Sequence, residues 1–431
     1  MIVTGRLVAV AIAAAVLVTA GWPSWFGVLA MSALLCALGA IDRALTADSA
    51  DVDLERAELS VLRLGTATEI ELTVTNTGAR TLRGRLWDDW PDSAGATDGE
   101  HRLALPPGHR VRLRTTLAPT RRGDRAAGPV TLRLWGPLGL AGHQFRRRVP
   151  ARVRALPPFR SERLLAGKVK RLQHLEGRNL ADLRGQGTEF DSFREYVPGD
   201  DVRTIDWRAT ARATDVLVRT WRPERNRQLL MLMDTGRVSA GRIGAGTRLD
   251  NAIEAALLLG SLAAAGGDSV GLLAYDREVR AELRSGTGRG VQAKLMHALA
   301  GVVPALVDTD AEGLVRATIR RARRRSLIVW FTSLDGAAVT ENLLPVLPVL
   351  AERHRVLIVS VTDPEIAAAA ADRDGRAALY RAAAAESRIA EQAVLQESLR
   401  RMGVAVIAAA GPDVPGALAD EYLELKQSAA L

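Results

Sequence analysis

The first 45 residues carry two apolar runs separated by a short turn. Residues 7–18 are all apolar, with the run extending to residue 22, and residues 25–41 are apolar apart from Ser32, Cys36 and Gly39. A helix in a soluble core rarely stays apolar on every face. Each run is about 16–17 residues long, which is near the lower limit for a helix that crosses a bilayer. The pattern therefore predicts a transmembrane helical hairpin over residues 1–45.

Charge at the ends of the two runs predicts their orientation. Arg6 precedes the first run and Arg43 follows the second, whereas the connecting turn carries no charge. The positive-inside rule then places both ends in the bacterial cytoplasm, with two spans in the inner membrane and the soluble domains in the cytoplasm. A cleaved signal peptide is the alternative, because residues 18–20 resemble a small-residue cleavage site. In that case the second run would still anchor the chain.

Residues 51–157 alternate apolar and polar positions with a period of two. The clearest segments are residues 70–76, 111–115 and 130–135, and Gly or Pro residues separate them. This alternation predicts an antiparallel β-sandwich. We expect residues 88–101 to be a flexible loop. No catalytic constellation is recognisable in this region.

Residues 227–425 alternate short apolar runs with segments of helical periodicity. This order predicts an α/β domain with a mostly parallel, doubly wound sheet that has helices on both faces. Ligands of such sheets bind at the carboxyl ends of the strands. We expect strands at residues 229–233, 270–275, 327–332, 356–361 and 404–408, an antiparallel edge strand at 279–283, and helices at 249–265, 315–324, 343–350 and 376–402.

A connecting region, residues 158–226, begins with a segment of helical spacing from Leu164 to Leu175, which is either a docking helix or a packed connector. A dense Arg/Asp cluster follows. Its turn is built on Pro198-Gly199-Asp200-Asp201. The residues that we single out in it are Arg194, Tyr196, Pro198, Gly199, Asp200, Asp201, Arg203, Asp206, Trp207, Arg208 and Arg212.

The charges of this cluster admit two interpretations. Bidentate ion pairs of Asp200, Asp201 and Asp206 with Arg194, Arg203, Arg208 and Arg212 would make it an internal scaffold. The same side chains would otherwise form a surface on which a partner docks. The spacing of the residues leaves both open.

The string over residues 185–212 resembles the signature of the bacterial family called domain of unknown function 58. The shared features are a glycine-rich start, Pro-Gly-Asp-Asp, Ile-Asp-Trp and Ala-Arg in this order. The resemblance implies a membrane hairpin, a β-sandwich that ends in a Gly-Pro-Leu-Gly-Leu segment, and a von Willebrand factor A-like α/β domain. It also implies that the protein acts together with a MoxR-class AAA+ ATPase in protein-complex assembly, maturation or envelope maintenance.

Von Willebrand factor A domains hold Mg²⁺ in a site that begins with Asp-x-Ser-x-Ser after the first strand. Here Asp234 is kept, but Gly236 and Val238 stand at the two serine positions, and Arg237 adds a positive charge. We therefore expect a degenerate, metal-free site in which Arg237 pairs with Asp234 or Asp335, and Mg²⁺ is the disfavoured alternative. The candidate positions of this degenerate site are Asp234, Thr287, Ser333 and Asp335.

The chain has 431 residues and a formal net charge of +9, from 58 Lys+Arg against 49 Asp+Glu. The strongest basic run, residues 320–325, suits nucleic-acid phosphates, but cations at the end of a helix also complement its dipole. A second run, residues 146–148, suits an exposed strand or an anionic lipid surface. The single cysteine, Cys36, excludes an intramolecular disulfide.

These observations together predict a non-enzymatic, membrane-anchored interaction protein that takes the AAA+ ATPase and other membrane proteins as partners. One alternative is a nucleic-acid-binding protein that uses the arginine runs. The other is an envelope hydrolase, although the sequence has no nucleophile–base arrangement that we recognise.

Overall fold

The structure is a computed structural model, and it describes residues 2–21, 24–57, 59–182, 189–222, 227–244, 246–334 and 342–428. The chain divides into two compact units, Met1–Pro158 and Phe159–Leu431. The division falls next to the Pro157-Pro158 linker. The first unit thus holds the predicted membrane segment together with the β-sandwich, and the second holds the connecting region together with the α/β sheet.

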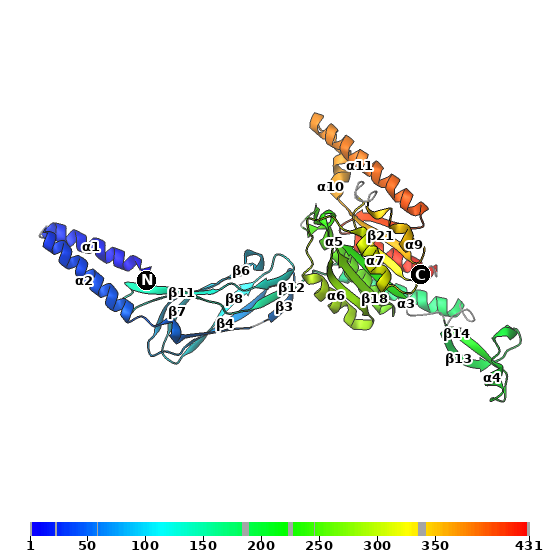
Figure 1. Cartoon of the computed structure of the whole chain (residues 1–431), viewed down its shortest axis with the longest axis horizontal. Coiled ribbons are helices and arrows are strands. Elements are labelled where there is room, and N and C mark those ends of the chain that lie inside the picture. The colour runs from blue at the N-terminus through cyan, green and yellow to red at the C-terminus, as the bar shows by residue number, and fades with distance from the viewer. Residues whose placement is uncertain are drawn as a thin grey trace. The chain divides into compact units, whose positions relative to one another are not determined.

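Two apolar helices open the first unit, α1 (Gly5–Gly21) and α2 (Trp25–Ala44), and they contact each other (Figure 1). The helical segment that begins with α2 is long and apolar enough to cross a membrane, whereas α1 has 17 residues and is shorter than a typical span. Large apolar residues such as Trp25 (86%) and Phe26 (81%) are largely exposed. These features support an association of the N-terminal region with a membrane.

A buried carboxylate joins α2 to the neighbouring sheet. Asp42, in the last turn of α2, is completely buried, and it accepts backbone N–H groups of Leu138, Leu140 and Ala141 at 2.8, 2.7 and 2.9 Å. A Cβ atom at Gly136 would lie 2.2 Å from the Asp42 carbonyl oxygen, so a glycine is needed there. The Gly-Pro-Leu-Gly-Leu segment is therefore the loop that receives the end of α2.

The β-sandwich has a five-stranded sheet, β1-β11-β10-β5-β7, and a four-stranded sheet, β2-β4-β8-β6, whose inner faces share one core. A further sheet, β3-β12-β9, contains a parallel pair, β3 with β12, which the antiparallel prediction did not include. The strands are β1 (Ile2–Val3), β2 (Val52–Arg56), β3 (Leu59–Arg63), β4 (Thr68–Asn76), β5 (Leu82–Asp88), β6 (Ala96–Thr97), β7 (Glu100–Leu105), β8 (Arg110–Leu117), β9 (Gly123–Ala126), β10 (Val130–Trp135), β11 (Ala141–Arg147) and β12 (Arg152–Leu156).

The prediction of a flexible loop over residues 88–101 is wrong. Trp90 and Ala94 are buried in the core, and Asp88 is buried as the partner of Arg56. Asp88 also accepts hydrogen bonds from Trp90 Nε1 at 3.2 Å and Thr115 Oγ1 at 2.7 Å. The sequence of this segment is polar partly because Asp88 belongs to a buried ion pair with Arg56. Hydrophobic periodicity does not reveal such a pair.

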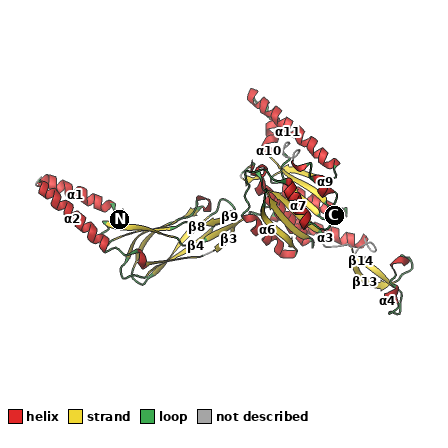
Figure 2. Ribbon diagram, viewed as in Figure 1, coloured by secondary structure: helices red, strands yellow, loops and turns green. Residues whose placement is uncertain are grey.

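The second unit is built on a six-stranded sheet of order β19-β18-β15-β20-β21-β22. Figure 2 shows strands of this unit with helices beside them. All neighbouring strands are parallel except the edge pair of β18 and β19, which is antiparallel. The predicted mostly parallel sheet and its antiparallel edge strand are therefore confirmed. The strands are β15 (Gln228–Asp234), β18 (Ser269–Tyr275), β19 (Val279–Gly286), β20 (Leu327–Phe331), β21 (Arg355–Thr362) and β22 (Ala405–Ala410).

Helices cover this sheet because its central strands are apolar throughout. Residues 229–233 of β15 are all buried, and nearly every residue of α5 is buried as well. At the far end of the sheet, buried Asp268 accepts hydrogen bonds from Tyr422 and from Lys426 Nζ, which fastens the C-terminal helix. The helices are α3 (Glu162–Asp182), α5 (Arg248–Ala265), α6 (Val291–Ala300), α7 (Ala311–Arg321), α9 (Leu347–Ala351), α10 (Pro364–Ala371), α11 (Arg376–Arg401) and α12 (Val414–Gln427).

The Arg/Asp cluster forms a small hairpin with a sheet of its own. Strands β13 (Glu189–Glu195) and β14 (Leu217–Arg222) pair antiparallel. Between them lie the 3₁₀ turn η3 (Val202–Thr204) and the single-turn helix α4 (Trp207–Thr210). We call the segment from Glu189 to Arg222 the signature hairpin.

Candidate functional site

Two regions carry the residues singled out from the sequence: the signature hairpin and the carboxyl-end edge of the large sheet. In the hairpin, Arg194 and Asp200 form a bidentate pair, with Nη1–Oδ2 at 2.7 Å and Nη2–Oδ1 at 2.5 Å. The Val197 N–H also donates to Asp200, at 3.0 Å. The hydrogen bond from Arg194 holds the pKa of Asp200 below its ordinary value. This pair closes the turn over Pro198 and Gly199.

The turn itself needs its glycine, since Gly199 has φ +113°, a conformation that other residues rarely adopt. Tyr196, next to the turn, is half-buried, and its N–H donates to the Val216 carbonyl at 2.8 Å. Asp201 caps η3 by accepting the Arg203 N–H at 2.9 Å. These residues shape the hairpin's backbone.

Asp206 organises the other end of the hairpin. Its side chain is 7% exposed, and Oδ1 accepts the N–H groups of Arg208 at 2.9 Å and Ala209 at 2.8 Å, so it caps α4. Oδ2 accepts Arg219 Nε at 2.5 Å. The Ala209 N–H and the Arg219 guanidinium together hold the pKa of Asp206 below its ordinary value. Sequence reasoning missed Arg219, whose position opposite Asp206 depends on how the two strands pair.

The remaining predicted arginines do not take part in this scaffold. Arg203, Arg208 and Arg212 are exposed, and their guanidinium groups have no hydrogen bond or ion pair with the part of the chain that the structure describes. Two large apolar side chains lie exposed in the same stretch, Trp207 (68% exposed) and Val202 (63%). We call these five residues the signature surface. The hairpin therefore combines both interpretations: two aspartates form a scaffold, and three arginines remain available.

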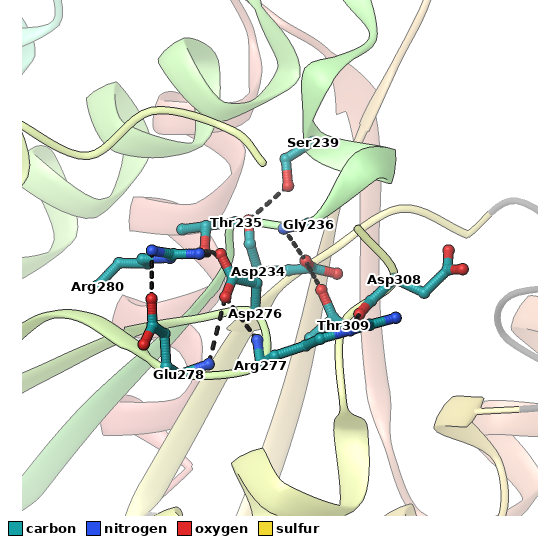
Figure 3. Close-up of polar contacts among 10 residues, drawn as sticks. All are labelled: Asp234, Thr235, Gly236, Ser239, Asp276, Arg277, Glu278, Arg280, Asp308 and Thr309. Atoms are coloured by element: carbon teal, nitrogen blue, oxygen red, sulfur yellow. Dashed lines mark hydrogen bonds and ion pairs between the residues drawn. The ribbon is translucent and has the colours of Figure 1, made fainter. Parts of the chain in front are cut away.

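At the carboxyl-end edge of the sheet, Asp234 ends β15 and lies beside the loop that follows β20. Figure 3 shows its carboxylate between Gly236 and Thr309. Oδ1 accepts the Gly236 N–H at 2.8 Å and Thr309 Oγ1 at 2.5 Å, and Oδ2 accepts Thr332 Oγ1 at 2.8 Å. Burial raises the pKa of Asp234, against the opposing effect of these three hydrogen bonds. Asp234 thus has neutral donors on both oxygens.

A second carboxylate, Asp276, lies at the end of β18 and is completely buried. It accepts Arg280 Nε at 2.7 Å, the Arg277 N–H at 2.5 Å and Thr235 Oγ1 at 3.2 Å. Burial by itself would raise the pKa of Asp276, but the hydrogen bonds from Arg280 and from the backbone outweigh it, so the pKa lies below its ordinary value. Figure 3 shows the two carboxylates in neighbouring networks.

The structure corrects the predicted composition of this edge. Thr309, which precedes α7, donates to Asp234, whereas Thr287 starts the 3₁₀ turn η5 (Gly288–Gly290) after the edge strand. Arg237 does not pair with Asp234; its Nη2 lies 2.7 Å from Asp308 Oδ1. The Ser333 hydroxyl accepts Arg248 Nη1 at 2.8 Å. Asp335 lies outside the described residues.

Mg²⁺ prefers an octahedral set of oxygen ligands, and Gly236 and Val238 offer no side-chain oxygen to an ion beside Asp234. Both carboxylate oxygens already accept hydrogen bonds. A Cβ atom at Gly236 would lie 2.2 Å from Thr309 Oγ1, so the threonine occupies the space of a serine side chain. The cavity left beside Asp234 has a volume of about 40 Å³, and Arg237 and Asp308 line it as a pair.

Comparison with solved structures gives low overall similarity. The FixG-related protein from Vibrio parahaemolyticus matches with 11% identity and a TM-score of 0.17, over 24% of this chain and 94% of that one. The GH20 exo-β-N-acetylglucosaminidase from Vibrio harveyi matches with 10% identity and a TM-score of 0.17, over 66% of this chain and 58% of that one. Neither similarity bears on fold or function.

Similar sequences occur in mycobacteria. Uncharacterized protein Rv1480 of Mycobacterium tuberculosis and Uncharacterized protein Mb1516 of Mycobacterium bovis are each 31% identical over 192 residues, 44% of this chain. The chain covers 60% of the length of these relatives. Residues 192–402, from the signature hairpin to the end of α11, match the family described as "Protein of unknown function DUF58".

Proposed function

We propose that this protein is a non-enzymatic, membrane-associated interaction protein of the DUF58 family. In this proposal its second unit works with a MoxR-class AAA+ ATPase in protein-complex assembly, maturation or envelope maintenance. The ATPase is taken from the family resemblance. The observation that carries the proposal is the signature surface, where Trp207 and Val202 are exposed close in sequence to three guanidinium groups that pair with no described residue.

An exposed tryptophan next to arginines has the composition of an interaction hot spot. Tryptophan and arginine are enriched among the residues that dominate binding energy. A partner surface that suits this one has an apolar pocket for Trp207 and carboxylates opposite Arg203, Arg208 and Arg212. Asp200 and Asp206 do not neutralise these cations, because Asp200 pairs with Arg194 and Asp206 with Arg219.

The membrane part of the proposal uses both apolar helices. We propose that α1 and α2 cross the inner membrane as two spans, with both soluble regions in the cytoplasm. The absence of charge between the helices and the flanking Arg6 and Arg43 support this orientation. Reporter fusions at the C-terminus test it: a reporter that is active only in the periplasm has to stay inactive, and activity there would contradict the cytoplasmic location.

We further propose that the α/β region is a von Willebrand factor A-like domain that functions without a metal. The strand order supports the first part, since numbering the six strands along the chain gives 3-2-1-4-5-6, with strand 3 antiparallel at the edge. The closed hydrogen bonding of Asp234 supports the second. Calorimetric titration of the full chain with Mg²⁺ and Mn²⁺ tests it, and binding that Asp234→Ala abolishes would contradict it.

Binding of a purified MoxR-class ATPase to the full chain in detergent tests the partnership. Trp207→Ala with Arg208→Ala removes the centre of the signature surface. The matched control, Tyr380→Ala with Arg289→Ala, removes an equally exposed aromatic and a cation elsewhere in the second unit. We expect the first pair to weaken binding by at least about tenfold, as hot-spot residues do, and the control to leave it unchanged. No binding by the wild-type chain, or equal effects of both pairs, would contradict the proposal.

A further inference from the structure

We propose that a cavity at the amino-end edge of the large sheet binds a phosphate group. The cavity has a volume of about 530 Å³, and Arg323, Arg324, Arg325, Arg353 and His354 line it. It lies where β20 and β21 begin, at the end of the sheet opposite to Asp234. Its residues are therefore distinct from those around Asp234 at the carboxyl-end edge and from those of the signature surface. This phosphate site does not depend on the proposed partnership with an ATPase.

The cavity is strongly positive because its lining has arginines and no carboxylate. The side chains of Arg323, Arg325 and Arg353 are exposed and have no ion pair within the described parts of the chain. Their neighbour Arg321 differs, since its Nη2 lies 2.8 Å from Glu282 Oε2. Arg323, Arg325 and Arg353 thus remain available to an external anion.

Helix-dipole complementarity does not account for these arginines. Helix α7 ends at Arg321, so Arg320 and Arg321 are the basic residues of its last turn. Arg323 and Arg325 come after the helix, and Arg353 comes from the segment before β21. Two segments distant in the sequence, residues 323–325 and the segment that contains Arg353, therefore supply cations to one cavity. The basic run at residues 320–325 does not by itself predict the contribution of Arg353.

His354 gives an independent indication of a ligand. The residue is 6% exposed, and neither Nδ1 nor Nε2 has a hydrogen-bond partner among the described residues. Buried polar groups nearly always have a partner in the protein or in ordered water. Burial, together with the charge of Arg353, lowers the pKa of His354, so the ring is neutral at physiological pH and keeps one N–H to donate. An anionic oxygen in the cavity is the acceptor that this group lacks.

Phosphate fits this set of donors better than other small anions. Guanidinium groups bind phosphate oxygens in a bidentate manner, and several of them can share one phosphate group. The volume is in the range of small-molecule sites, about 300–1,000 Å³, so an organic group attached to the phosphate has room. That group can belong to a soluble phosphate ester or to the headgroup of an anionic phospholipid, and both share the chemistry that the cavity recognises.

Calorimetric titration of the full chain in detergent, at low salt, tests the proposal with two probes. Inorganic pyrophosphate represents a soluble ligand, and dihexanoyl phosphatidylglycerol, kept below its micelle concentration, represents a lipid headgroup. We expect at least one probe to bind with one-to-one stoichiometry. Binding of pyrophosphate alone would indicate a soluble ligand, and binding of the short-chain lipid alone would indicate a headgroup.

A charge-matched pair of double variants separates a built site from general positive charge. Arg325→Gln with Arg353→Gln removes two cations from the cavity, and Arg289→Gln with Arg320→Gln removes two exposed cations outside it. We expect the cavity variant to lose at least about tenfold in affinity, because each charge-assisted hydrogen bond contributes substantially, and the control to change little. His354→Phe is expected to weaken binding as well.

Three results would overturn the proposal. The first is that neither probe binds, and the second is that both double variants weaken binding equally. The third is that duplex DNA binds while both small probes fail to bind. The last result would favour a nucleic-acid surface over a phosphate site. Thermal unfolding of each variant in the absence of probe shows whether it is folded, so that a loss of binding is not confused with a loss of structure.

Discussion

The signature hairpin and the carboxyl-end edge of the large sheet both contain aspartates and arginines, but these side chains are paired differently in the two regions. The hairpin pairs Asp200 and Asp206 with two arginines and leaves three other arginines exposed. At the sheet edge, Asp276 pairs with Arg280 and Asp234 is surrounded by hydroxyl and backbone donors. The first region leaves cations exposed at the surface, whereas the second uses its donors internally.

Asp206 in the hairpin and Asp234 at the sheet edge illustrate this difference through the directions of their pKa shifts. Asp206 and Asp234 have similarly small exposed fractions, 7% and 6%. Yet the pKa of Asp206 is lowered by the Ala209 N–H and the Arg219 guanidinium, and the pKa of Asp234 is raised because burial outweighs its three neutral donors. The two carboxylates thus differ in surroundings as well as in partner: Asp234 ends a central strand of the large sheet, where desolvation dominates, whereas Asp206 lies in a two-stranded hairpin and pairs with Arg219.

Asp276→Ala is the substitution with the largest expected effect. It leaves Thr235, the Arg277 and Glu278 N–H groups and Arg280 without their acceptor. We expect the free energy of unfolding to fall by roughly 2–4 kcal/mol, since each buried donor that loses its acceptor costs about 1–3 kcal/mol. Denaturant titration measures it. Because the folded pKa of Asp276 is lowered, its contribution is present above its unfolded pKa and is lost as the pH falls through the folded value.

The conservative Asp276→Asn is the control for this change. It keeps two acceptor lone pairs and the volume of the side chain but loses the charge that Arg280 faces. We expect a smaller loss than for alanine, and one that disappears in acid. Equal stability of wild type and both variants at neutral pH would contradict the view that the sheet edge is an internal network.

Gly236→Ser tests how tightly this edge is packed. The added Cβ would lie 2.2 Å from Thr309 Oγ1 and 2.8 Å from the Val307 carbonyl oxygen. Overpacking of this kind costs about 1–3 kcal/mol, so we expect a clear drop in the midpoint of denaturation. Thr309→Ser, which keeps the hydroxyl, serves as the mild control. A Gly236→Ser variant as stable as the wild type would contradict the tight packing of this edge.

The large sheet could be predicted closely because its strands are unbroken apolar runs. The expected strand 229–233 is observed as Gln228–Asp234, and the expected helix 249–265 as Arg248–Ala265. Thr309 could not be found in this way. It reaches Asp234 from 75 positions along the chain, and the contact exists only once the sheet order brings the loop before α7 to the end of β15. Periodicity reports which face a residue occupies, and not which loops meet.

The hairpin shows the same limit. Its turn could be predicted, since Pro198, Gly199 and Asp200 are local and Arg194 lies six positions from its partner. The partner of Asp206 lies across the hairpin, 13 positions away, and an equally basic choice such as Arg208 is nearer. The set of arginines proposed from local spacing did not include Arg219, because the pairing register of β13 and β14 decides the contact.

Asp206→Ala tests whether the hairpin depends on this one buried carboxylate. In the described residues 192–219, only Asp206 and Val218 are buried. We expect faster hydrogen exchange at the amides of Arg208, Ala209 and Leu217, and unchanged protection in β15 and β20. Arg212→Ala, at an exposed position in the same hairpin, is the control and should leave exchange unchanged. Unaltered protection of the hairpin in the Asp206 variant would contradict its role as the scaffold.

Asp234→Asn should have the smallest effect on stability at neutral pH, within about 1 kcal/mol, because the Thr332 hydroxyl can either donate or accept. Its pH dependence is the informative measurement. The folded pKa of Asp234 is raised, so its stabilising contribution is present below the unfolded pKa and is lost as the pH rises through the folded value. Asparagine does not ionise. The variant should therefore gain stability relative to the wild type as the pH increases, opposite in sign to Asp276→Asn. Denaturation of both variants across the same pH series checks this, and parallel curves for the two would show that the neighbouring carboxylates do not differ in the way that their partners imply.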